Sequence, residues 1–204
     1  MAFRTRSRFL LTTLVIVAAL TLTACAGQVP ATAWLGLTPG DGVAYLAGST
    51  KAYAINVVDG TKKWEFEHTV QQANLLGTQK VPDQIHAAPL VGEGLVYLGT
   101  DGGHLVAVDS VTGGQKWSFV PEVPATFIPF IKEKPSPVYA GPVLAGKRVL
   151  FAGTAHKIYA LDAATGKPDW EFDAGSRVWG TPLVVGAAVY VPTLGHKLFA
   201  IDAT

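Results

Sequence analysis

Apolar and polar positions alternate in a unit that recurs along most of this chain. In its clearest copy, residues 158–172, an alternating apolar run ends at Asp162, a turn follows at Gly166, and a second run carries Trp170. Alternation with a period of two predicts strands, and a Gly-containing connection between two such strands predicts a β-hairpin.

The same unit occurs in residues 53–66 and 105–119, and a fourth copy opens at residues 198–204. In each of the three longer copies an Asp or Asn stands eight positions before a Trp, with a Gly halfway between them. The three sets are Asn56, Gly60 and Trp64; Asp109, Gly113 and Trp117; and Asp162, Gly166 and Trp170.

Each position of this set has a physical reason. Asp and Asn side chains accept hydrogen bonds from backbone N–H groups two residues on, and Gly adopts a positive φ without a Cβ clash. Trp presents a large apolar face with one N–H donor. A single hairpin would leave that face in water, so we expect successive units to stack and each Trp to dock its sheet onto the next one.

Two shorter apolar runs separated by a Gly-containing turn precede each hairpin, as in residues 88–99. Each repeat therefore offers four short strands, an arrangement typical of propeller blades. We predict an all-β fold, a partial (open or half-ring) β-propeller of about four four-stranded blades, the last of them incomplete. The predicted blades span about residues 33–66, 86–119, 139–172 and 179–204.

The repeat resembles the PQQ-type β-propeller repeat over residues 33–204. The resemblance rests on Tyr-Ala-Leu-Asp-Ala-Ala-Thr-Gly-Lys-Pro-Asp-Trp at 159–170, Pro-x-Val at 89–91 and Val-Tyr-x-Gly at 96–99. It implies that the repeat Trp docks each blade onto the next. Proteins similar in this way include lipoproteins of the BamB family, which are scaffolds of outer-membrane protein assembly, and quinone-dependent alcohol and glucose dehydrogenases.

Four blades are about half of the eight-bladed ring that this resemblance implies. An open array leaves its first and last sheets with bare apolar faces and an unpaired edge. Two alternatives follow. Two such halves pair into a full ring, or the sequence is a truncated version of a longer protein, which its end inside the repeat motif at Thr204 favours.

The N-terminal residues follow a different pattern. Three Arg residues precede an apolar run over residues 9–22, which is short for a membrane span. The sequence Leu-Thr-Ala-Cys at 22–25 resembles the bacterial lipobox, in which the Cys is lipid-modified and the preceding peptide is removed. We therefore expect a lipoprotein signal peptide at residues 1–24, a lipidated Cys25 with a tether over residues 25–32, and an extracytoplasmic protein. The lipid would hold it on the outer face of the cytoplasmic membrane or on an outer membrane.

Charge and cysteine content exclude some functions. The formal net charge is +1, and removal of residues 1–24 would change it to −2 because three Arg residues leave with them. Without a basic patch, nucleic-acid binding has no support. Cys25 is the only Cys, which excludes an internal disulfide and a Cys-based metal site.

Similarity to quinone-dependent dehydrogenases implies a vicinal Cys pair, a calcium-holding carboxylate cluster and an Asp general base. The single Cys excludes the pair, and the repeat Asp residues are assigned to turns. We expect no cofactor and no catalytic residue, with a remnant of a PQQ-dependent dehydrogenase as an alternative.

Three histidines, His104, His156 and His196, precede the repeat Asp by five or six positions. Neutral imidazole is a common metal ligand, so a ring of histidines would suggest a metal site. Equivalent positions on different blades are separated by whole sheets, however, whereas zinc–nitrogen bonds are about 2.0–2.1 Å long. We interpret the three histidines as turn residues and expect no metal.

His86, Tyr139 and Trp179 each stand three residues before the Pro that opens a blade. This common position predicts that they lie near one mouth of the central channel, where aromatic and imidazole groups could hold a sugar or a peptide. The alternative is that they only close the channel.

Two insertions, residues 67–85 and 120–138, follow the Trp strands of the first two blades and should protrude on one face. Five Pro residues stiffen the second insertion, which limits the entropy lost on binding. Its apolar residues would form a partner-binding patch or fold back over the blade edges. These residues are Phe127, Ile128, Phe130 and Ile131.

Together these patterns predict a membrane-anchored extracytoplasmic scaffold or protein-interaction module without catalytic activity. Its expected partners are the membrane, through the lipid on Cys25, and other envelope proteins or a second half-propeller. A role in envelope protein assembly comes from the resemblance alone. The alternative is a sensor that binds a small molecule or a sugar.

Overall fold

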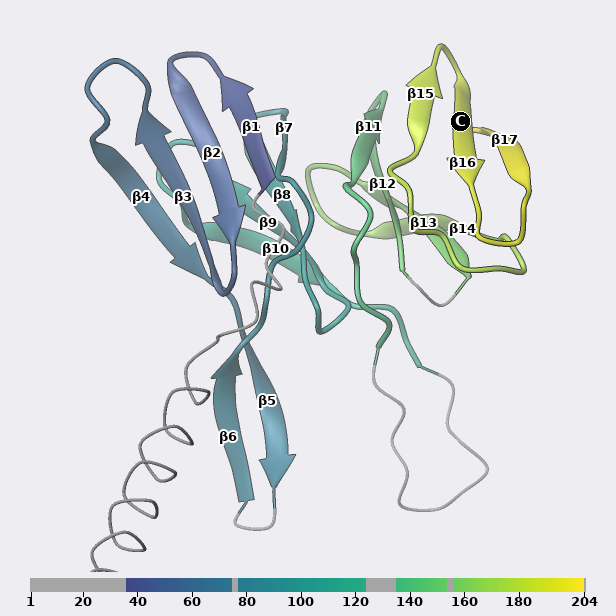
Figure 1. The fold of residues 1–204 in the computed structure, drawn as a ribbon, viewed down its shortest axis with the longest axis horizontal. Coiled ribbons are helices and arrows are strands. Elements are labelled where there is room, and N and C mark those ends of the chain that lie inside the picture. The colour runs from purple at the N-terminus through teal and green to yellow at the C-terminus, as the bar shows by residue number, and fades with distance from the viewer. Residues whose placement is uncertain (1–35, 75–76, 124–134, 154–155, 204) are drawn as a thin grey trace, which may run out of the picture. The chain divides into compact units, whose positions relative to one another are not determined.

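The computed structural model describes residues 36–74, 77–123, 135–153 and 156–203. Every helix or strand found among them is a β-strand, as the alternating pattern predicts (Figure 1). Within these ranges there is no helix long and apolar enough to cross a membrane.

Three four-stranded antiparallel sheets and one three-stranded sheet follow one another along the chain, and we call them blades 1 to 4. Blade 1 contains β1 (Gly36–Gly40), β2 (Val43–Gly48), β3 (Lys51–Asn56) and β4 (Lys62–Glu67). Blade 2 contains β7 (Leu90–Gly92), β8 (Leu95–Gly99), β9 (Leu105–Asp109) and β10 (Gln115–Phe119). Blade 3 contains β11 (Val143–Ala145), β12 (Arg148–Ala152), β13 (Lys157–Asp162) and β14 (Pro168–Asp173). Blade 4 contains β15 (Leu183–Val185), β16 (Ala188–Pro192) and β17 (Leu198–Asp202). The strands of each blade pair in chain order, which confirms the predicted four-stranded repeat.

The first insertion forms a hairpin of its own. Strands β5 (Thr69–Asn74) and β6 (Gly77–Pro82) pair only with each other, and Thr69 stands opposite Pro82 at the base. Figure 1 shows the hairpin extending away from the end of blade 1. Most side chains of β6 are exposed, so the hairpin owes little to a core of its own.

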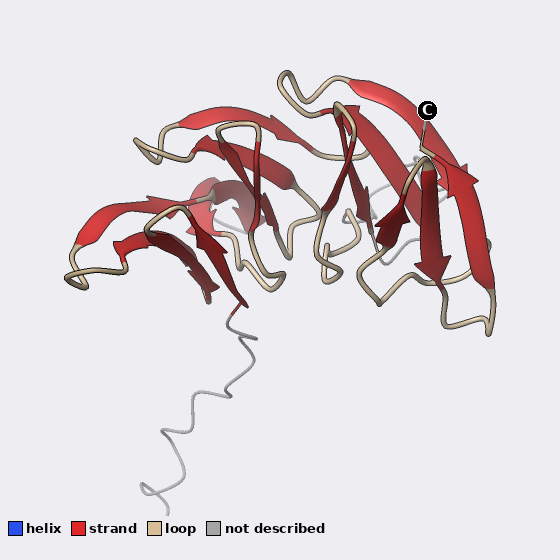
Figure 2. Ribbon diagram, turned by 90° about the horizontal axis from the view of Figure 1, so that it is seen from above, coloured by secondary structure: helices blue, strands red, loops and turns tan. Residues whose placement is uncertain are grey.

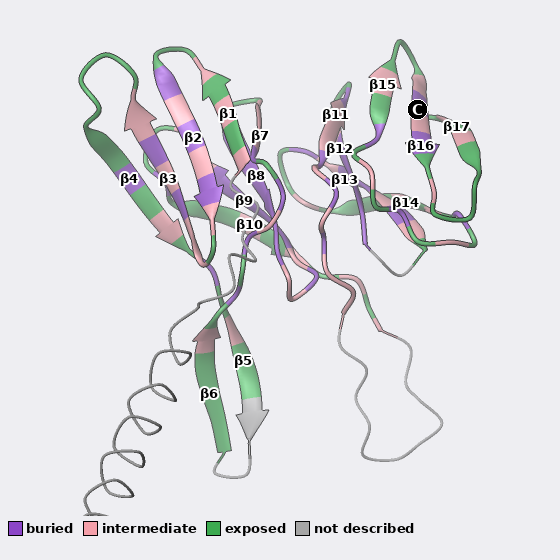
Figure 3. Cartoon of the chain, viewed as in Figure 1, coloured by how far each residue is buried: buried purple, intermediate pink, exposed green. Residues whose placement is uncertain are grey.

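Consecutive blades pack face to face, and the alternation of residues along each strand explains how. In β8, Val96 and Leu98 lie in an apolar cluster with blade 1, whereas Leu95 and Tyr97 lie in a second cluster with blade 3. A third cluster joins blades 3 and 4. Both faces of β8 are therefore covered, and all five of its residues are buried (Figure 3). Among the described residues the series of blades does not close into a ring (Figure 2).

The repeat Trp side chains lie between blades. Trp64 of blade 1 is 6% exposed, and its Nε1 donates a hydrogen bond to the carbonyl of Ser110 in blade 2 at 3.0 Å. Trp117 of blade 2 donates in the same way to Ala163 of blade 3 at 3.1 Å. Each indole therefore docks on the Asp–Gly turn of the following blade.

The turn Gly is where the indole comes closest. A Cβ on Gly113 would lie 2.8 Å from Trp64, and a Cβ on Gly166 would lie 2.5 Å from Trp117, both shorter than van der Waals contact. Gly60, Gly113 and Gly166 also have φ values of 73°, 73° and 72°, a region that disfavours a side chain. The Gly of the motif thus serves the turn and, in blades 2 and 3, the docking of the preceding blade.

The Asp or Asn of each motif caps its turn. The Oδ1 atom of Asn56 accepts the N–H of Val58 at 3.0 Å, and that of Asp109 accepts the N–H of Val111 at 3.0 Å. Asp162 Oδ1 accepts the N–H of Thr165 at 2.8 Å in the third copy. The backbone N–H of Thr112, then the Lys116 side chain and the N–H of Val111, lower the pKa of Asp109 to about 2.

Trp170 lies differently. It is half-buried against the cluster between blades 3 and 4, yet its buried Nε1 has no hydrogen-bond partner within the described ranges. Ala203 follows the Asp of blade 4 as Ser110 and Ala163 follow those of blades 2 and 3, but no hydrogen bond joins Trp170 to it in the described structure.

Candidate functional site

A row of aromatic side chains crosses blades 2, 3 and 4. His86, Tyr139 and Trp179 lie on the segments that lead into β7, β11 and β15. The ring centroids of His86 and Tyr139 are 5.2 Å apart in an edge-to-face arrangement, and those of Tyr139 and Trp179 are 5.3 Å apart. The structure therefore brings together the three residues that share one repeat position, and we call them the aromatic row.

Asp101 completes this row and was not singled out from the sequence. Its Oδ1 accepts a hydrogen bond from the Tyr139 hydroxyl at 3.1 Å and lies 3.6 Å from His86 Nε2. Burial raises the pKa of Tyr139, and the neighbouring Asp101 raises it further, so the phenol stays a donor at neutral pH. The row thus combines three rings with one carboxylate.

The row changes from enclosed to open along its length. The His86 side chain is 12% exposed, whereas Trp179 is 53% exposed. Aromatic faces of this kind stack on planar groups and on sugar rings, and exposed Trp is enriched where proteins bind each other. The aromatic row can therefore bind such groups. Three blades that pack against one another hold its residues in place.

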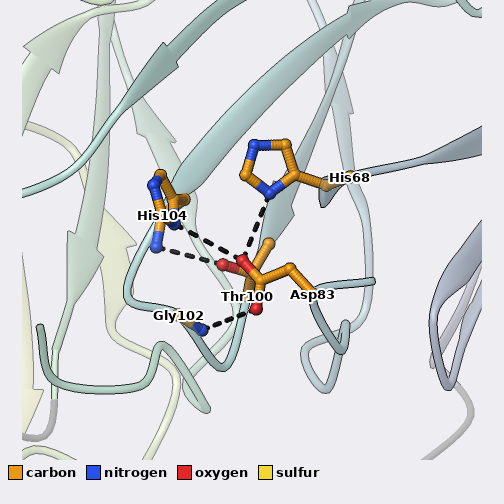
Figure 4. Close-up of polar contacts among 5 residues, drawn as sticks. All are labelled: His68, Asp83, Thr100, Gly102 and His104. Carbon is orange, nitrogen blue, oxygen red and sulfur yellow. Dashed lines mark hydrogen bonds and ion pairs between the residues drawn. The ribbon is translucent and has the colours of Figure 1, made fainter. Parts of the chain in front are cut away.

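A second cluster joins the base of the β5–β6 hairpin to blade 2. His68 and Asp83 flank the hairpin, and His104 immediately precedes β9. Figure 4 shows both imidazoles turned toward Asp83. His68 Nδ1 lies 3.2 Å and His104 Nδ1 lies 3.4 Å from the same oxygen, Asp83 Oδ2. We call these three residues the His–Asp–His cluster.

The Asp83 carboxylate is buried, at 4% exposure, and it is firmly held. Its Oδ1 accepts the N–H of Gly102 at 2.7 Å. Burial alone would raise the pKa of Asp83, but the polar groups of His104, His68, Thr100 and Gly102 outweigh this and hold the pKa well below its usual range. The cluster therefore contains an ionised carboxylate between two imidazoles.

His104 requires a correction to the interpretation of the three repeat histidines. His156 and His196 are exposed turn residues with φ values of 73° and 58°. In blade 2 the corresponding left-handed position is taken by Gly103, with a φ of 79°. His104 is displaced by one residue from that position, and its side chain points to the hairpin base rather than to solvent.

The expectation of no metal rested on the spacing of His104, His156 and His196 between blades and did not consider the first insertion. His68, Asp83 and His104 offer one ligand atom each, and these atoms lie within 4.8 Å of one another. His68 and Asp83 belong to a segment without a repeat, so their meeting was not visible in the periodic pattern.

Other predicted site residues lie outside the described residues. They are Cys25, with the predicted signal peptide and tether at residues 1–32, and the four apolar residues of the second insertion, Phe127, Ile128, Phe130 and Ile131.

The residues of the aromatic row do not fit a pyrroloquinoline quinone. The resemblance implies a calcium-holding carboxylate cluster beside that cofactor, whereas the row offers a single carboxylate, Asp101, which already accepts the Tyr139 hydroxyl. Asp109 and Asp162, which the repeat would offer as further ligands, are engaged by turn N–H groups. No reaction step is therefore derived through this cofactor.

Stacked four-stranded antiparallel blades that are docked by one Trp per repeat define a repeat protein of the β-propeller class. A family model described as "PQQ: Glucose/ethanol/alcohol dehydrogenase, beta-propeller domain" matches residues 51–179. The chain belongs to this PQQ β-propeller family.

Proteins similar to this chain include a kinase, an alcohol dehydrogenase and an assembly factor. The serine/threonine-protein kinase AfsK of Streptomyces griseus is 31% identical over 137 residues, which are 67% of this chain and 15% of the kinase. The quinohemoprotein alcohol dehydrogenase of Comamonas testosteroni is 27% identical over 136 residues, covering 65% of this chain and 18% of the enzyme. The outer membrane protein assembly factor BamB of Xanthomonas campestris pv. campestris is 32% identical over 78 residues, covering 38% of this chain and 18% of that protein.

Solved structures show the same fold. BamB from Moraxella catarrhalis aligns with a TM-score of 0.62 at 23% identity, over 84% of this chain and 46% of that one. The computationally designed Ika4 protein aligns with a TM-score of 0.63 at 13% identity, over 88% of this chain and 95% of the designed one. The chain thus spans less than a fifth of the three curated relatives named above and about half of the BamB structure.

Proposed function

We propose that this chain is a non-catalytic protein-interaction module held outside the cytoplasm by a lipid on Cys25, and that it acts in the bacterial cell envelope. The observation that carries the proposal is the aromatic row, whose Trp179 is 53% exposed although its ring packs on Tyr139. A large aromatic ring that is fixed by its neighbours and still open to solvent is the kind of anchor on which binding energy concentrates.

The packing of the blades supports this role. Trp117 holds blades 2 and 3 in register, which orders His86 and Tyr139 before a partner arrives, and the Trp179 ring packs on Tyr139. A preorganised surface loses little conformational entropy on binding. The similarity to proteins named BamB supports an envelope role, and a second half-propeller is an alternative partner.

Site-specific photo-crosslinking in the native host tests the proposed surface. A benzophenone amino acid at position 179 should form adducts with an envelope assembly protein, identified by mass spectrometry. The matched control is position 111, since Val111 is 78% exposed on the outer turn of blade 2. Adducts at position 179 that are the same as those at position 111, or none at all, would contradict the proposal.

Metabolic labelling with an alkyne fatty acid tests the anchor separately. The full chain should become labelled and fractionate with membranes, whereas Cys25→Ser should do neither. Labelling that persists in Cys25→Ser would remove the lipid from the proposal and leave the binding surface untouched.

A sugar-binding sensor is the second candidate, and Asp101 is the observation that favours it. A carboxylate beside stacking rings is a common way to bind hydroxyl groups while an aromatic face covers the sugar ring. Titration with neutral oligosaccharides should then quench Trp fluorescence in the unmodified chain and not in Trp179→Ala. The absence of any saturable change would exclude this candidate.

A further inference from the structure

The His–Asp–His cluster has the ligand set and the spacing of a metal site. We propose that His68, Asp83 and His104 bind a divalent transition-metal ion of the zinc type, and that the ion fastens the β5–β6 hairpin to blade 2. This inference concerns the hairpin base and does not depend on the function proposed for the aromatic row.

Two of the three distances between ligand atoms agree with tetrahedral coordination, and all three ligand atoms lie within 4.8 Å of one another. Zinc bonds to His nitrogen and carboxylate oxygen of about 2.0–2.2 Å place neighbouring ligand atoms about 3.3 Å apart. The distances from Asp83 Oδ2 to the Nδ1 atoms of His68 and His104 are 3.2 and 3.4 Å. Two imidazoles and a carboxylate also form a ligand set that zinc commonly uses with three protein ligands and one further position.

The contact of His104 with Asp83 is better explained by a shared ion than by a hydrogen bond. His104 Nδ1 is buried and has no hydrogen-bond partner in the described structure, although Asp83 Oδ2 is only 3.4 Å away. A buried polar atom without a partner is destabilising, and such atoms in native structures have a reason. Coordination of a cation by the Nδ1 lone pair would satisfy it.

Charge balance points the same way. The ion pairs found for Asp83 among the described residues are those with His68 and His104. Among the described residues no Lys or Arg pairs with this carboxylate, and an isolated buried charge is strongly unfavourable. A divalent cation between the three side chains supplies that charge.

The backbone around the cluster is built to hold the ligands in place. The Gly102 N–H fixes the second carboxylate oxygen of Asp83, and a Cβ on Gly102 would lie 2.7 Å from that side chain. The Thr100 hydroxyl accepts the backbone N–H of His104 at 3.0 Å. Hydrogen bonds that orient metal ligands from outside the first coordination sphere are a regular part of metal sites.

The cluster also closes the foot of the hairpin. The N–H of Asp83 donates to the carbonyl of His68 at 2.8 Å, so the two residues form the last rung below β5 and β6. His104 comes from the loop between β8 and β9. A bound ion would therefore tie a mostly exposed hairpin to the buried part of blade 2.

The test measures metal uptake by the full chain, purified in detergent and freed of metal with a chelator. Equilibrium dialysis against Zn²⁺ should give one ion per chain, and Co²⁺ should give the intense visible absorption of a tetrahedral site. His68→Gln, His104→Gln and Asp83→Asn should each weaken binding by at least about tenfold, since loss of an orienting partner alone has such an effect.

His196→Asn is the matched control, because His196 is exposed in a left-handed turn that Asn tolerates, and this variant should bind as the unmodified chain does. Circular dichroism without metal shows which variants are folded, and only folded variants are compared. Hydrogen exchange adds an independent measurement, since Zn²⁺ should slow exchange in residues 69–82 of the unmodified chain and not in His104→Gln. The proposal is overturned if the folded chain takes up no Zn²⁺ at micromolar concentration, or if both His variants bind it unchanged.

Discussion

The junctions between blades 1 and 2 and between blades 2 and 3 differ from the junction between blades 3 and 4. At the first two, a Trp Nε1 bonds to a carbonyl of the next turn, and the ring lies on a Gly. At the third, the Nε1 of Trp170 has no partner among the described residues. Burial changes in parallel, since β8 is buried throughout whereas Leu183, Val185 and Leu198 of blade 4 are 62%, 56% and 68% exposed.

This contrast separates two contributions of the same side chain. The apolar face of the Trp is used at all three junctions, because Trp170 also packs in an interblade cluster. Among the described residues, the N–H bond and the close contact with Gly occur at the first two junctions, where the ring lies on the turn of the following blade. Docking specificity therefore resides in the turn of the next blade as much as in the Trp.

The largest expected effect is loss of the whole indole. Trp64→Ala should lower the free energy of unfolding by about 3–5 kcal/mol, as for other large buried aromatic residues. Trp170→Ala should lower it by roughly half as much, because this ring is less buried and makes no hydrogen bond within the described ranges. Urea denaturation monitored by circular dichroism measures both. Equal losses would show that the two junctions are equivalent.

A methyl group on the turn Gly should separate docking from turn strain. Gly166→Ala should lower the free energy of unfolding by about 1–2 kcal/mol through left-handed backbone strain. The added Cβ would lie 2.5 Å from the Trp117 ring, and this clash should cost about 1–3 kcal/mol more. Gly60→Ala is the matched control, since it has nearly the same φ but nothing within 4 Å of its Cβ. It should therefore show the strain alone. The same urea titration compares them, and equal losses would contradict a docking role for Gly166.

Removal of the indole N–H should distinguish the junctions more finely. Trp64→Phe loses the hydrogen bond to Ser110, whose carbonyl then keeps only the Tyr45 hydroxyl as a donor, whereas Trp170→Phe removes a buried donor that has no partner among the described residues. We expect Trp170→Phe to be less destabilising than Trp64→Phe by about 1 kcal/mol. A larger loss in Trp170→Phe would indicate that its N–H is bonded in solution.

The smallest expected effect is the pH dependence of stability that the Asp109 carboxylate produces. Since the folded-state pKa of Asp109 is lowered to about 2, its contribution to stability is fully present above the ordinary pKa of 3.8 and is lost as the pH falls through 2. A carbon-13 NMR titration of the carboxyl group should give a midpoint of about 2. Asn56, at the same position in blade 1, does not titrate, so Asp109→Asn should make stability less dependent on pH below 4. A midpoint near 3.8 would contradict the cap.

The strands and their stacking could be predicted because both depend on a local period. Alternation identifies the strands, and one Trp per repeat requires a neighbouring sheet. The aromatic row was also visible, since the residues at equal offsets before the blade Pro fall on neighbouring inner segments of consecutive blades. Asp101 was missed because nothing in its local sequence marks it as a partner of Tyr139.

The His–Asp–His cluster was not predicted for two physical reasons. His68 and Asp83 are 15 residues apart along the chain, and only the pairing of β5 with β6 brings them together. His104 was grouped with His156 and His196 although it stands five rather than six positions before the repeat Asp, and only the structure shows that Gly103 takes the left-handed position instead. The insertions do not repeat along the chain, so a contact between an insertion and a blade cannot be predicted from the periodic pattern and is seen only in the structure.

Because β8 packs against a blade on each of its faces, the order in which the blades unfold can be predicted. Each blade is held only by its immediate neighbours, as are the units of a linear repeat array, so cooperativity extends from blade to blade rather than through one common core. Among the described blades, local opening should begin between blades 3 and 4, where no indole hydrogen bond is found, and stop at the first bonded indole. Amide exchange should be slowest in inner strands of blades 2 and 3, such as β8 and β12, which have a packed blade on each side.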